Sequence, residues 1–249
     1  MTRLVVVTDD REGGEAAADI IAAGIASSPR FVLGIATGST PLTTWSALAS
    51  RGLDLAPIEA FALDEYVGLP QGHPHSFESV VQREVVAPLG LDPARVHVPI
   101  SYGAEPRDAA ARYERQIVDA GGIDVQVLGI GRNGHVAFNE PGSPLDSLTR
   151  VARLSRETRE DDSRFFGSVE EVPETCITQG LGTIARARTL VLLAFGSHKA
   201  QALASALDGP IGAAVPASVM RRHPDAIVIA DFRAAALLES VDTERFVTA

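Results

Sequence analysis

Short apolar runs alternate with longer alanine-rich stretches along most of this chain, and that order limits the fold more than any other feature of its 249 residues. The apolar runs have the length of buried strands, and the stretches between them are amphipathic at helical spacing. Strands that are apolar on both faces and separated by helices predict a parallel sheet covered on both sides. The strands that we expect are Leu4–Val7, Phe31–Ile35, Glu59–Leu63, Asp124–Leu128, Leu190–Phe195 and Ala226–Ala230. The clearest helices are Gly14–Ser27, Asp108–Ala120 and Lys199–Leu207.

Residues 1–249 are expected to form one domain of the α/β class, because no repeat, low-complexity tract or linker divides the chain. The expected architecture is doubly wound and Rossmann-like, with helices on both faces of a mostly parallel sheet. The segment Ser143–Glu171 is richer in charge and poorer in pattern than the rest. We expect this segment to form a small lid-like insertion over the edge of the sheet.

Composition excludes several classes of protein. The formal net charge of -10 argues against a nucleic-acid partner, because such partners bind basic surfaces. Cys176 is the only cysteine, so the chain has no internal disulfide framework and fits a reducing compartment. The first residues turn acidic after a few apolar positions, and no apolar run reaches membrane-spanning length. We therefore expect a cytoplasmic protein with no membrane partner.

The segment from Asp124 to Pro141, DVQVLGIGRNGHVAFNEP, concentrates groups that can carry chemistry. It opens as an apolar strand and then places Asn133, His135, Asn139 and Glu140 within eight residues. The carboxyl ends of the strands are where open α/β sheets hold their ligands. A histidine beside a carboxylate suits proton transfer near neutral pH. We expect the reaction centre here.

The same segment contains a dinucleotide-binding pattern, GxGxxG, formed by Gly129, Gly131 and Gly134. That motif requires a helix that begins at its last glycine, so that a pyrophosphate can bind the helix N-terminus. Pro141 would break a helix begun at Gly134, and the pattern does not follow the first strand. Both features argue against an NAD site.

The loop Ala36–Pro41, ATGSTP, directly follows the expected strand Phe31–Ile35. Gly38 allows close approach of a ligand to the backbone, and we expect Ser39 or Thr40 to cap the helix that Pro41 begins. Such a loop can bind an anion through backbone N–H groups and hydroxyls. An ordinary capped turn explains the loop equally well. There is no GxxxxGK[ST] motif, so a nucleoside triphosphate is not indicated.

Two adjacent carboxylates, Asp64 and Glu65, follow the strand Glu59–Leu63. Neighbouring residues of an extended chain point in opposite directions, so we expect these two to have different tasks. One of them would face a cleft, and the other would cap or pair within the fold. A solvated strand end is the alternative.

Lys199 is the only lysine among 22 basic residues. A compact ammonium suits a phosphate at a site where a planar guanidinium does not fit, although drift towards arginine explains most of the skew. Arg164 is a candidate second contact to a phosphate, with a surface ion pair as the alternative. The remaining histidines, namely His73, His75, His97, His198 and His223, have no metal-ligand spacing.

Six motifs occur in an order that resembles one family: ATGSTP, LDEYVGLP followed by HPHSF, GIGRNGHVAFNEPGS, DDSRFF, GSHKA and PASVMRRHP. They resemble the glucosamine-6-phosphate deaminases (glucosamine/galactosamine-6-phosphate isomerases), which are related to the 6-phosphogluconolactonases. The resemblance runs from about Phe31 to Asp231 and covers most of the chain.

This resemblance implies an enzyme of amino-sugar catabolism, of hydrolase or isomerase type, that turns glucosamine 6-phosphate into fructose 6-phosphate and ammonia without a metal or other cofactor. Asp64 matches the family's base, His135 its ring-opening histidine, and Glu140 the carboxylate that orients this histidine. Asn133 stands where some members carry aspartate. The positions that match substrate contacts, most of them around the phosphate, are Thr37, Gly38, Ser39, Thr40, Arg164 and Lys199. The implied partner is a small amino-sugar phosphate, and a homo-oligomer is left open.

Two other functions deserve comparison. In related lactonases the segment around this histidine resembles GxGxDGHxASLFP. This chain has Asn133 in place of that aspartate and Phe138-Asn139-Glu140 in place of Ser-Leu-Phe. A sugar-phosphate sensor attached to DNA would need a helix-turn-helix, and the first strand begins at Leu4. The set of Asp64, His135 and Glu140 also favours a catalyst over a binding module.

Overall fold

The computed structural model describes residues 2–239, and a seven-stranded parallel sheet forms its centre. The order across the sheet is β1-β10-β9-β6-β2-β3-β5. These strands are β1 (Arg3–Val7), β2 (Val32–Ile35), β3 (Glu59–Ala62), β5 (Val96–His97), β6 (Val125–Gly129), β9 (Thr189–Ala194) and β10 (Ala226–Asp231). The six strands predicted from the sequence are all present, with ends that differ by at most one residue. The short strand β5 was not predicted.

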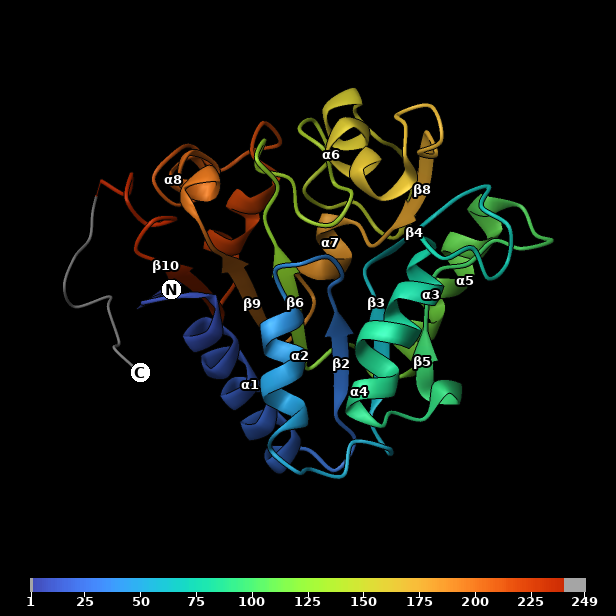
Figure 1. The fold of residues 1–249 in the computed structure, drawn as a ribbon, viewed down its shortest axis with the longest axis horizontal. Helices are drawn as coiled ribbons and strands as arrows, with labels where there is room; N and C mark the ends of the chain where they lie inside the picture. Colours follow the sequence, from blue (N-terminus) through green and yellow to red (C-terminus); the bar gives the residue numbers. More distant parts are fainter. Residues whose placement is uncertain (1, 240–249) are drawn as a thin grey trace.

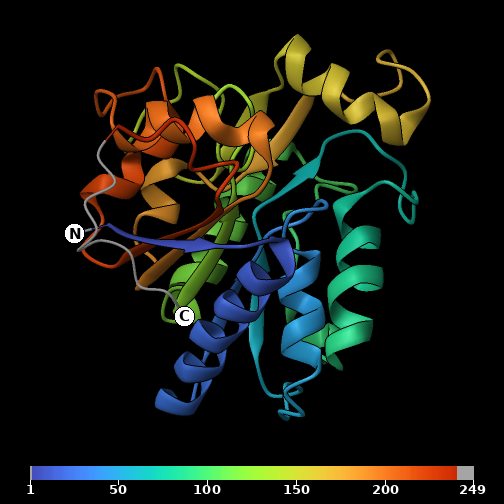
Figure 2. The ribbon, with the colours of Figure 1, turned by 60° about the vertical axis from the view of Figure 1, so that its left-hand side comes forward.

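Helices cover both faces of this sheet, which confirms the doubly wound α/β architecture. The views in Figures 1 and 2 place α1, α2 and the run from α3 to α4 on one face, and α5 and α7 on the other. The helices are α1 (Asp10–Ser27), α2 (Leu42–Ala49), α3 (Phe77–Val81), α4 (Ala87–Leu89), α5 (Pro106–Asp119), α6 (Arg156–Phe166), α7 (Leu181–Ile184) and α8 (Ala200–Leu207). A π-helical segment, Gln82–Val86, joins α3 to α4, and short 3-10 helices span Pro93–Arg95, Ser197–Lys199 and Pro216–Arg222.

Helix α1 begins four residues earlier than the sequence pattern predicted, because Asp9 caps it. The Asp9 carboxylate accepts a hydrogen bond from the Glu12 backbone N–H at 2.8 Å, which satisfies one of the unpaired donors of the first turn. Farther along α1, a Cβ on Gly14 would lie 2.5 Å from the Thr43 backbone. The absence of a side chain at Gly14 therefore lets α1 pack closely against α2.

A second, antiparallel sheet lies beside the carboxyl ends of the main strands, in the order β4-β8-β7. Its strands are β4 (Asp64–Tyr66), β7 (Arg150–Arg153) and β8 (Thr175–Thr178). Figure 1 shows α6 above the carboxyl ends of the main sheet. The segment Ser143–Glu171, expected as an insertion with little pattern, thus supplies regular structure, namely β7 and α6. The sequence pattern predicted neither element, because β7 begins and ends with arginine and most residues of α6 are polar.

The chain reverses its order across the sheet between β2 and β6, which is where open α/β sheets form a crevice. These two strands pair only through Leu33 with Val125 and Gly34 with Gln126. A Cβ on Gly34 would lie 2.2 Å from the Gln126 amide, so the glycine makes room for this buried side chain. Past this pair of residues the strands separate, and the loops that follow them border a shared space.

Candidate active site

A cavity of about 650 Å³ lies at this crevice, and most of the predicted functional residues line it. Its walls come from the segments that follow β2, β3, β6 and β9, four neighbouring strands of the sheet, and from α6, α3 and the π-helical segment after α3. Asp64, His135 and Lys199 all line it. The other predicted residues that line it are Thr37, Gly38, Ser39, Thr40 and Arg164. The structure thus brings a carboxylate and an imidazole from separate strands into one cavity with Lys199.

The loop after β2 borders the cavity, but its predicted cap is wrong. Helix α2 begins at Leu42, and Pro41 occupies the capping position without a side-chain hydrogen bond. Neither Ser39 nor Thr40 caps α2, because Pro41 stands between them and the first helical residue. Gly38 has a left-handed backbone with φ of 90°, which a residue with a side chain rarely adopts. The loop therefore turns at Gly38 and presents its hydroxyl residues along the cavity wall.

Basic side chains gather at one end of the cavity. Lys199 follows β9 in a 3-10 turn, and its Nζ donates to the Ile130 carbonyl at 2.6 Å. Burial lowers the pKa of Lys199, and the positive charges of Arg164 and Arg132 lower it further. The negative charge of Asp161 acts in the opposite direction and raises this pKa. Arg132 is paired with Asp161, with Nε 3.1 Å from Oδ2. A dianionic group such as a phosphate would stabilise this concentration of positive charge.

Asp64 and Glu65 point in different directions, as the alternation of an extended chain predicts. Asp64 is 6% exposed and lines the cavity. Burial raises its pKa well above the usual range, and the neighbouring carboxylates of Glu65 and Asp162 raise it further. Glu65 instead accepts backbone N–H groups of Tyr66, Phe77 and Glu78 at 2.7, 3.0 and 2.8 Å. It thereby stabilises the N-terminus of α3, which is the structural role expected for one of the two carboxylates.

His135 is held by the turn that follows β6. Its backbone N–H and its Nδ1 both contact Oδ1 of Asn133, at 3.1 and 2.7 Å. Because the amide oxygen can only accept, Nδ1 carries the proton and Nε2 is left as the basic atom. Burial lowers the pKa of His135, which favours the neutral imidazole. Chain positions 136–149 contain no helix, so the helix that a dinucleotide would require is missing from this turn.

Asn133 and Glu140 lie behind His135 rather than in the lining of the cavity. The Asn133 amide donates to Oε2 of Glu140 at 2.9 Å, and this oxygen is 3.9 Å from Nδ1 of His135. Burial alone would raise the pKa of Glu140, but hydrogen bonds from the Thr158 hydroxyl, the Ser155 N–H and Asn133, together with His135, lower it. Glu140 is thus held as a carboxylate that orients the imidazole through Asn133. The two donors Ser155 and Thr158 begin α6, so the helix above the cavity is bonded to this group.

Several residues of the cavity were not singled out from the sequence. Tyr66 and Asp162 line it and are joined by a hydrogen bond of 2.7 Å from the tyrosine hydroxyl. His75 also lines the cavity, with its ring 5.2 Å from that of Phe166. The only sequence signal for Asp162 was its place in the DDSRFF motif beside Arg164, since burial of an acidic side chain leaves no pattern. Among residues 2–239 there is no cluster of histidine, cysteine and acidic side chains suited to a metal ion.

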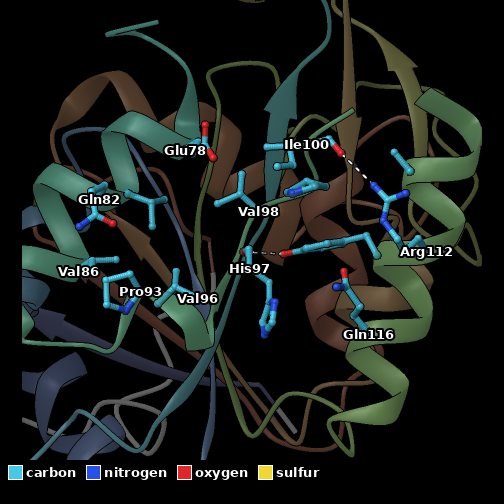
Figure 3. A pocket seen from close by; sticks show the side chains of 14 residues that line it. Glu78, Gln82, Val86, Pro93, Val96, His97, Val98, Ile100, Arg112 and Gln116 are labelled. Atoms are coloured by element: carbon cyan, nitrogen blue, oxygen red, sulfur yellow. Dashed lines mark hydrogen bonds between the residues drawn. The ribbon is translucent and has the colours of Figure 1, made fainter. Parts of the chain in front are cut away.

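A second cavity, of about 430 Å³, lies between α3, β5 and α5 (Figure 3). Its walls combine valine, proline and isoleucine side chains with the polar side chains of Glu78, Gln82, His97, Arg112, Tyr113 and Gln116. None of the predicted functional residues lines it. Of these two cavities, the first is therefore the candidate active site.

Comparison with known proteins agrees with this geometry. The family model described as glucosamine-6-phosphate isomerases/6-phosphogluconolactonase matches residues 11–229. The chain belongs to this family. Two similar family members are the glucosamine-6-phosphate deaminases of Cutibacterium acnes and of Bifidobacterium longum subsp. infantis. The first is 48% identical over 247 residues, with 98% of this chain and 95% of that protein covered, and the second is 47% identical over 259 residues, with 99% and 96% covered.

Among similar solved structures, one belongs to a deaminase and another to a lactonase that shares the fold. A monomeric glucosamine-6-phosphate deaminase superposes with a TM-score of 0.91 at 35% identity, over 94% of this chain and 99% of that one. A 6-phosphogluconolactonase from Thermotoga maritima gives a TM-score of 0.74 at 20% identity, over 93% of this chain and 100% of that one, which shows the shared fold alone. These relatives are named deaminases and isomerases, so the expected label of a hydrolase is not supported.

Two further findings concern the oligomeric state and the membrane. The structural relative is described as monomeric, so it lends no support to a homo-oligomer. Within residues 2–239, none of the helices has the length and apolar character that crossing a bilayer requires.

Proposed function

We propose that this chain converts glucosamine 6-phosphate and water into fructose 6-phosphate and ammonia. The observation that carries the proposal is the single cavity in which Asp64, His135 and a basic end around Lys199 meet. Relatives of about half identical sequence that bear the name of this activity support it. We also propose a cytoplasmic enzyme, as a role in amino-sugar catabolism would require.

In this proposal the basic end of the cavity binds the phosphate. Lys199 and Arg164 contribute charge, and the Thr37–Thr40 loop contributes backbone N–H groups and hydroxyls. Binding energy from the phosphate, which does not react, holds the sugar carbons close to the other groups. The phosphate thus fixes the position of C1 and C2.

His135 opens the sugar ring. Its unprotonated Nε2 accepts the proton of the C1 hydroxyl and returns a proton to the ring oxygen, which breaks the bond between C1 and that oxygen. Asn133 and Glu140 act through His135 as positioning residues, because they fix the tautomer that leaves Nε2 basic.

Asp64 then moves a proton from C2 to C1 of the open-chain aldehyde. Removal of the C2 proton, together with the shift of a proton from the amine to O1, gives an enolamine, and return of the C2 proton at C1 gives the imine of fructose 6-phosphate. Water hydrolyses this imine to the ketone and releases ammonia. The raised pKa of Asp64 makes its ionised carboxylate a stronger base than an exposed aspartate.

We propose that Ser143–Glu171 serves as the cover of this cavity within one domain. Support comes from Arg164 and Phe166 of α6, which line the cavity, and from the bonds between the first turn of α6 and Glu140. Hydrogen exchange of α6 with and without a bound sugar phosphate tests this role. Slower exchange in the bound state is the expected result, and unchanged exchange contradicts it.

The decisive assay measures ammonia released from glucosamine 6-phosphate, alongside hydrolysis of 6-phosphogluconolactone by the same protein. We expect ammonia release in the wild type and its loss in Asp64→Asn, an isosteric change that removes the base. The variant should still bind glucitol 6-phosphate, an unreactive open-chain sugar phosphate. Full activity of Asp64→Asn removes this residue from the mechanism, and lactone hydrolysis without ammonia release replaces the proposed function by the lactonase reaction.

A further inference from the structure

The cavity contains a carboxylate that the proposed proton transfers do not use. Asp162 lies on α6 and lines the cavity together with Asp64 of β4. The Tyr66 hydroxyl donates to Oδ2 of Asp162 at 2.7 Å. For the second oxygen, Oδ1, residues 2–239 provide no hydrogen-bond donor. One oxygen of Asp162 is therefore open to a ligand.

The surroundings of Asp162 are short of positive charge. Asp64 and Tyr66 face it from β4, Asp161 and Arg164 from its own helix, and Glu140 from the turn after β6. Burial raises the pKa of Asp162, and the Tyr66 hydrogen bond and Arg164 offset this only in part. Two carboxylates, Asp64 and Asp162, thus meet in one buried region, and each disfavours the charge of the other.

Charge is separated along the cavity. Lys199, Arg132 and His198 lie at one end, and Arg164 acts on both Lys199 and Asp162. Asp64 and Asp162 influence one another at the acidic end. A ligand that fits both ends carries an anionic group and, a few carbon atoms away, a cationic one.

We propose that Asp162, together with Asp64, binds the protonated amine of the substrate and thereby selects an amino-sugar phosphate over its neutral hydroxyl counterpart. This inference rests on the proposed function and assigns a residue to its specificity. The ammonium supplies the positive charge that the carboxylate pair lacks. It also favours ionisation of Asp64 beside C2, the carbon that bears the amine and loses the proton. A hydroxyl at C2 gives neither effect.

A purely structural role is the competing explanation, because the bond from Tyr66 joins α6 to β4. A structural latch, meaning the hydrogen bond between Tyr66 and Asp162, would have the same effect on the binding of a charged and of a neutral ligand. The amine site depends on the charge of Asp162. Asparagine at position 162 accepts the same hydrogen bond and has the same shape, so it removes the charge and keeps the latch.

The test compares two unreactive open-chain probes by titration calorimetry. These are 2-amino-2-deoxyglucitol 6-phosphate, which carries the amine, and glucitol 6-phosphate, which carries a hydroxyl in its place. We expect the wild type to bind the amine probe at least about tenfold more tightly, as for a charge-assisted contact. In Asp162→Asn the preference should fall to about threefold or less, with the affinity for glucitol 6-phosphate unchanged or improved. A preference retained in Asp162→Asn overturns the inference.

Matched variants separate charge from structure. Asp161→Asn removes a carboxylate from the same helix, but one that pairs with Arg132 at the basic end, so the amine preference should persist. Tyr66→Phe removes the latch and should also retain the preference, and its loss there would favour the structural role. Asp162→Glu restores the charge and should restore part of the preference even if Asp162→Asn folds poorly. Equal binding of both probes by the wild type refutes only this inference, whereas failure to bind either probe also refutes the proposed function.

Discussion

Replacement of Gly131 by alanine tests whether this glycine exists to make room for the catalytic imidazole. A Cβ at position 131 would lie 2.2 Å from Cε1 of His135 and 2.4 Å from both ring nitrogens. Gly131 does not have a left-handed backbone, so alanine adds a steric clash without backbone strain. The middle glycine of GxGxxG thus accommodates a side chain of the same turn, where a dinucleotide site would accommodate a pyrophosphate.

The size of the effect follows from the geometry. Ordinary contact with a carbon atom begins near 3.4 Å, so the ring must retreat by about 1 Å. A movement of that size breaks the 2.7 Å bond between Nδ1 of His135 and Asn133, which sets the tautomer. Misplacement of a catalytic group by about 1 Å lowers the rate by roughly 100-fold, or about 2.7 kcal/mol of transition-state free energy.

The assay is kcat/KM for ammonia release, with Gly212→Ala as the control. A Cβ on Gly212 meets no atom within 4 Å, and its φ is not positive, so activity within about twofold of the wild type is expected. Thermal unfolding of both variants checks that they remain folded. A folded Gly131→Ala variant that retains kcat/KM within about threefold of the wild type refutes the reasoning.

Three further results are expected. Lys199→Ala should raise KM by about 10- to 100-fold with a smaller change in kcat, as one lost charged hydrogen bond implies, and an unchanged KM excludes the phosphate contact. Burial raises the pKa of Glu65 from 4.5 to about 6, although its backbone hydrogen bonds act to lower it. The protonated side chain therefore stabilises the fold fully below pH 4.5, and this stabilisation is lost as the pH rises through 6. Urea unfolding should show wild type losing about 2 kcal/mol relative to Glu65→Gln between pH 4 and 7, and parallel pH profiles would contradict this. Asp64→Asn should raise the melting temperature at pH 7, because a neutral isostere replaces a carboxylate whose charge burial disfavours, and a lower melting temperature would count against that account.

Six of the seven strands of the main sheet could be predicted from the sequence because they read as apolar runs, whereas β5 has only two residues. The second sheet could not. Strand β4 has three residues and is separated from β3 by Leu63 alone, so its sequence looks like the end of β3. Strand β7 is Arg-Val-Ala-Arg, whose apolar content is too low to signal a buried element. Its pairing with β8 depends on chain positions far from it in sequence.

Parts of the candidate site could be predicted where the backbone geometry of a short segment determines which way its reactive side chains point. Asp64 and Glu65 were expected to diverge because extended residues alternate, and they do. The cap expected at Ser39 or Thr40 failed because the sequence shows a capping residue but not where the helix begins. Asp162 was missed because an acidic residue on a polar helix is normally solvated, and only the packed structure shows the cavity beside it.

The groups of the proposed chemistry follow the carboxyl ends of four adjacent strands, β9, β6, β2 and β3, except Asp162 and Arg164, which lie on α6. The opposite rim of the sheet, where these strands start, therefore contributes no residue to the proposed chemistry. Chain positions 28–30, 51–54 and 119–122 form largely exposed connections on that rim and border neither cavity. Affinity tags, fluorescent labels or new chain ends placed there should leave turnover intact, which makes this rim the natural site for engineering the protein.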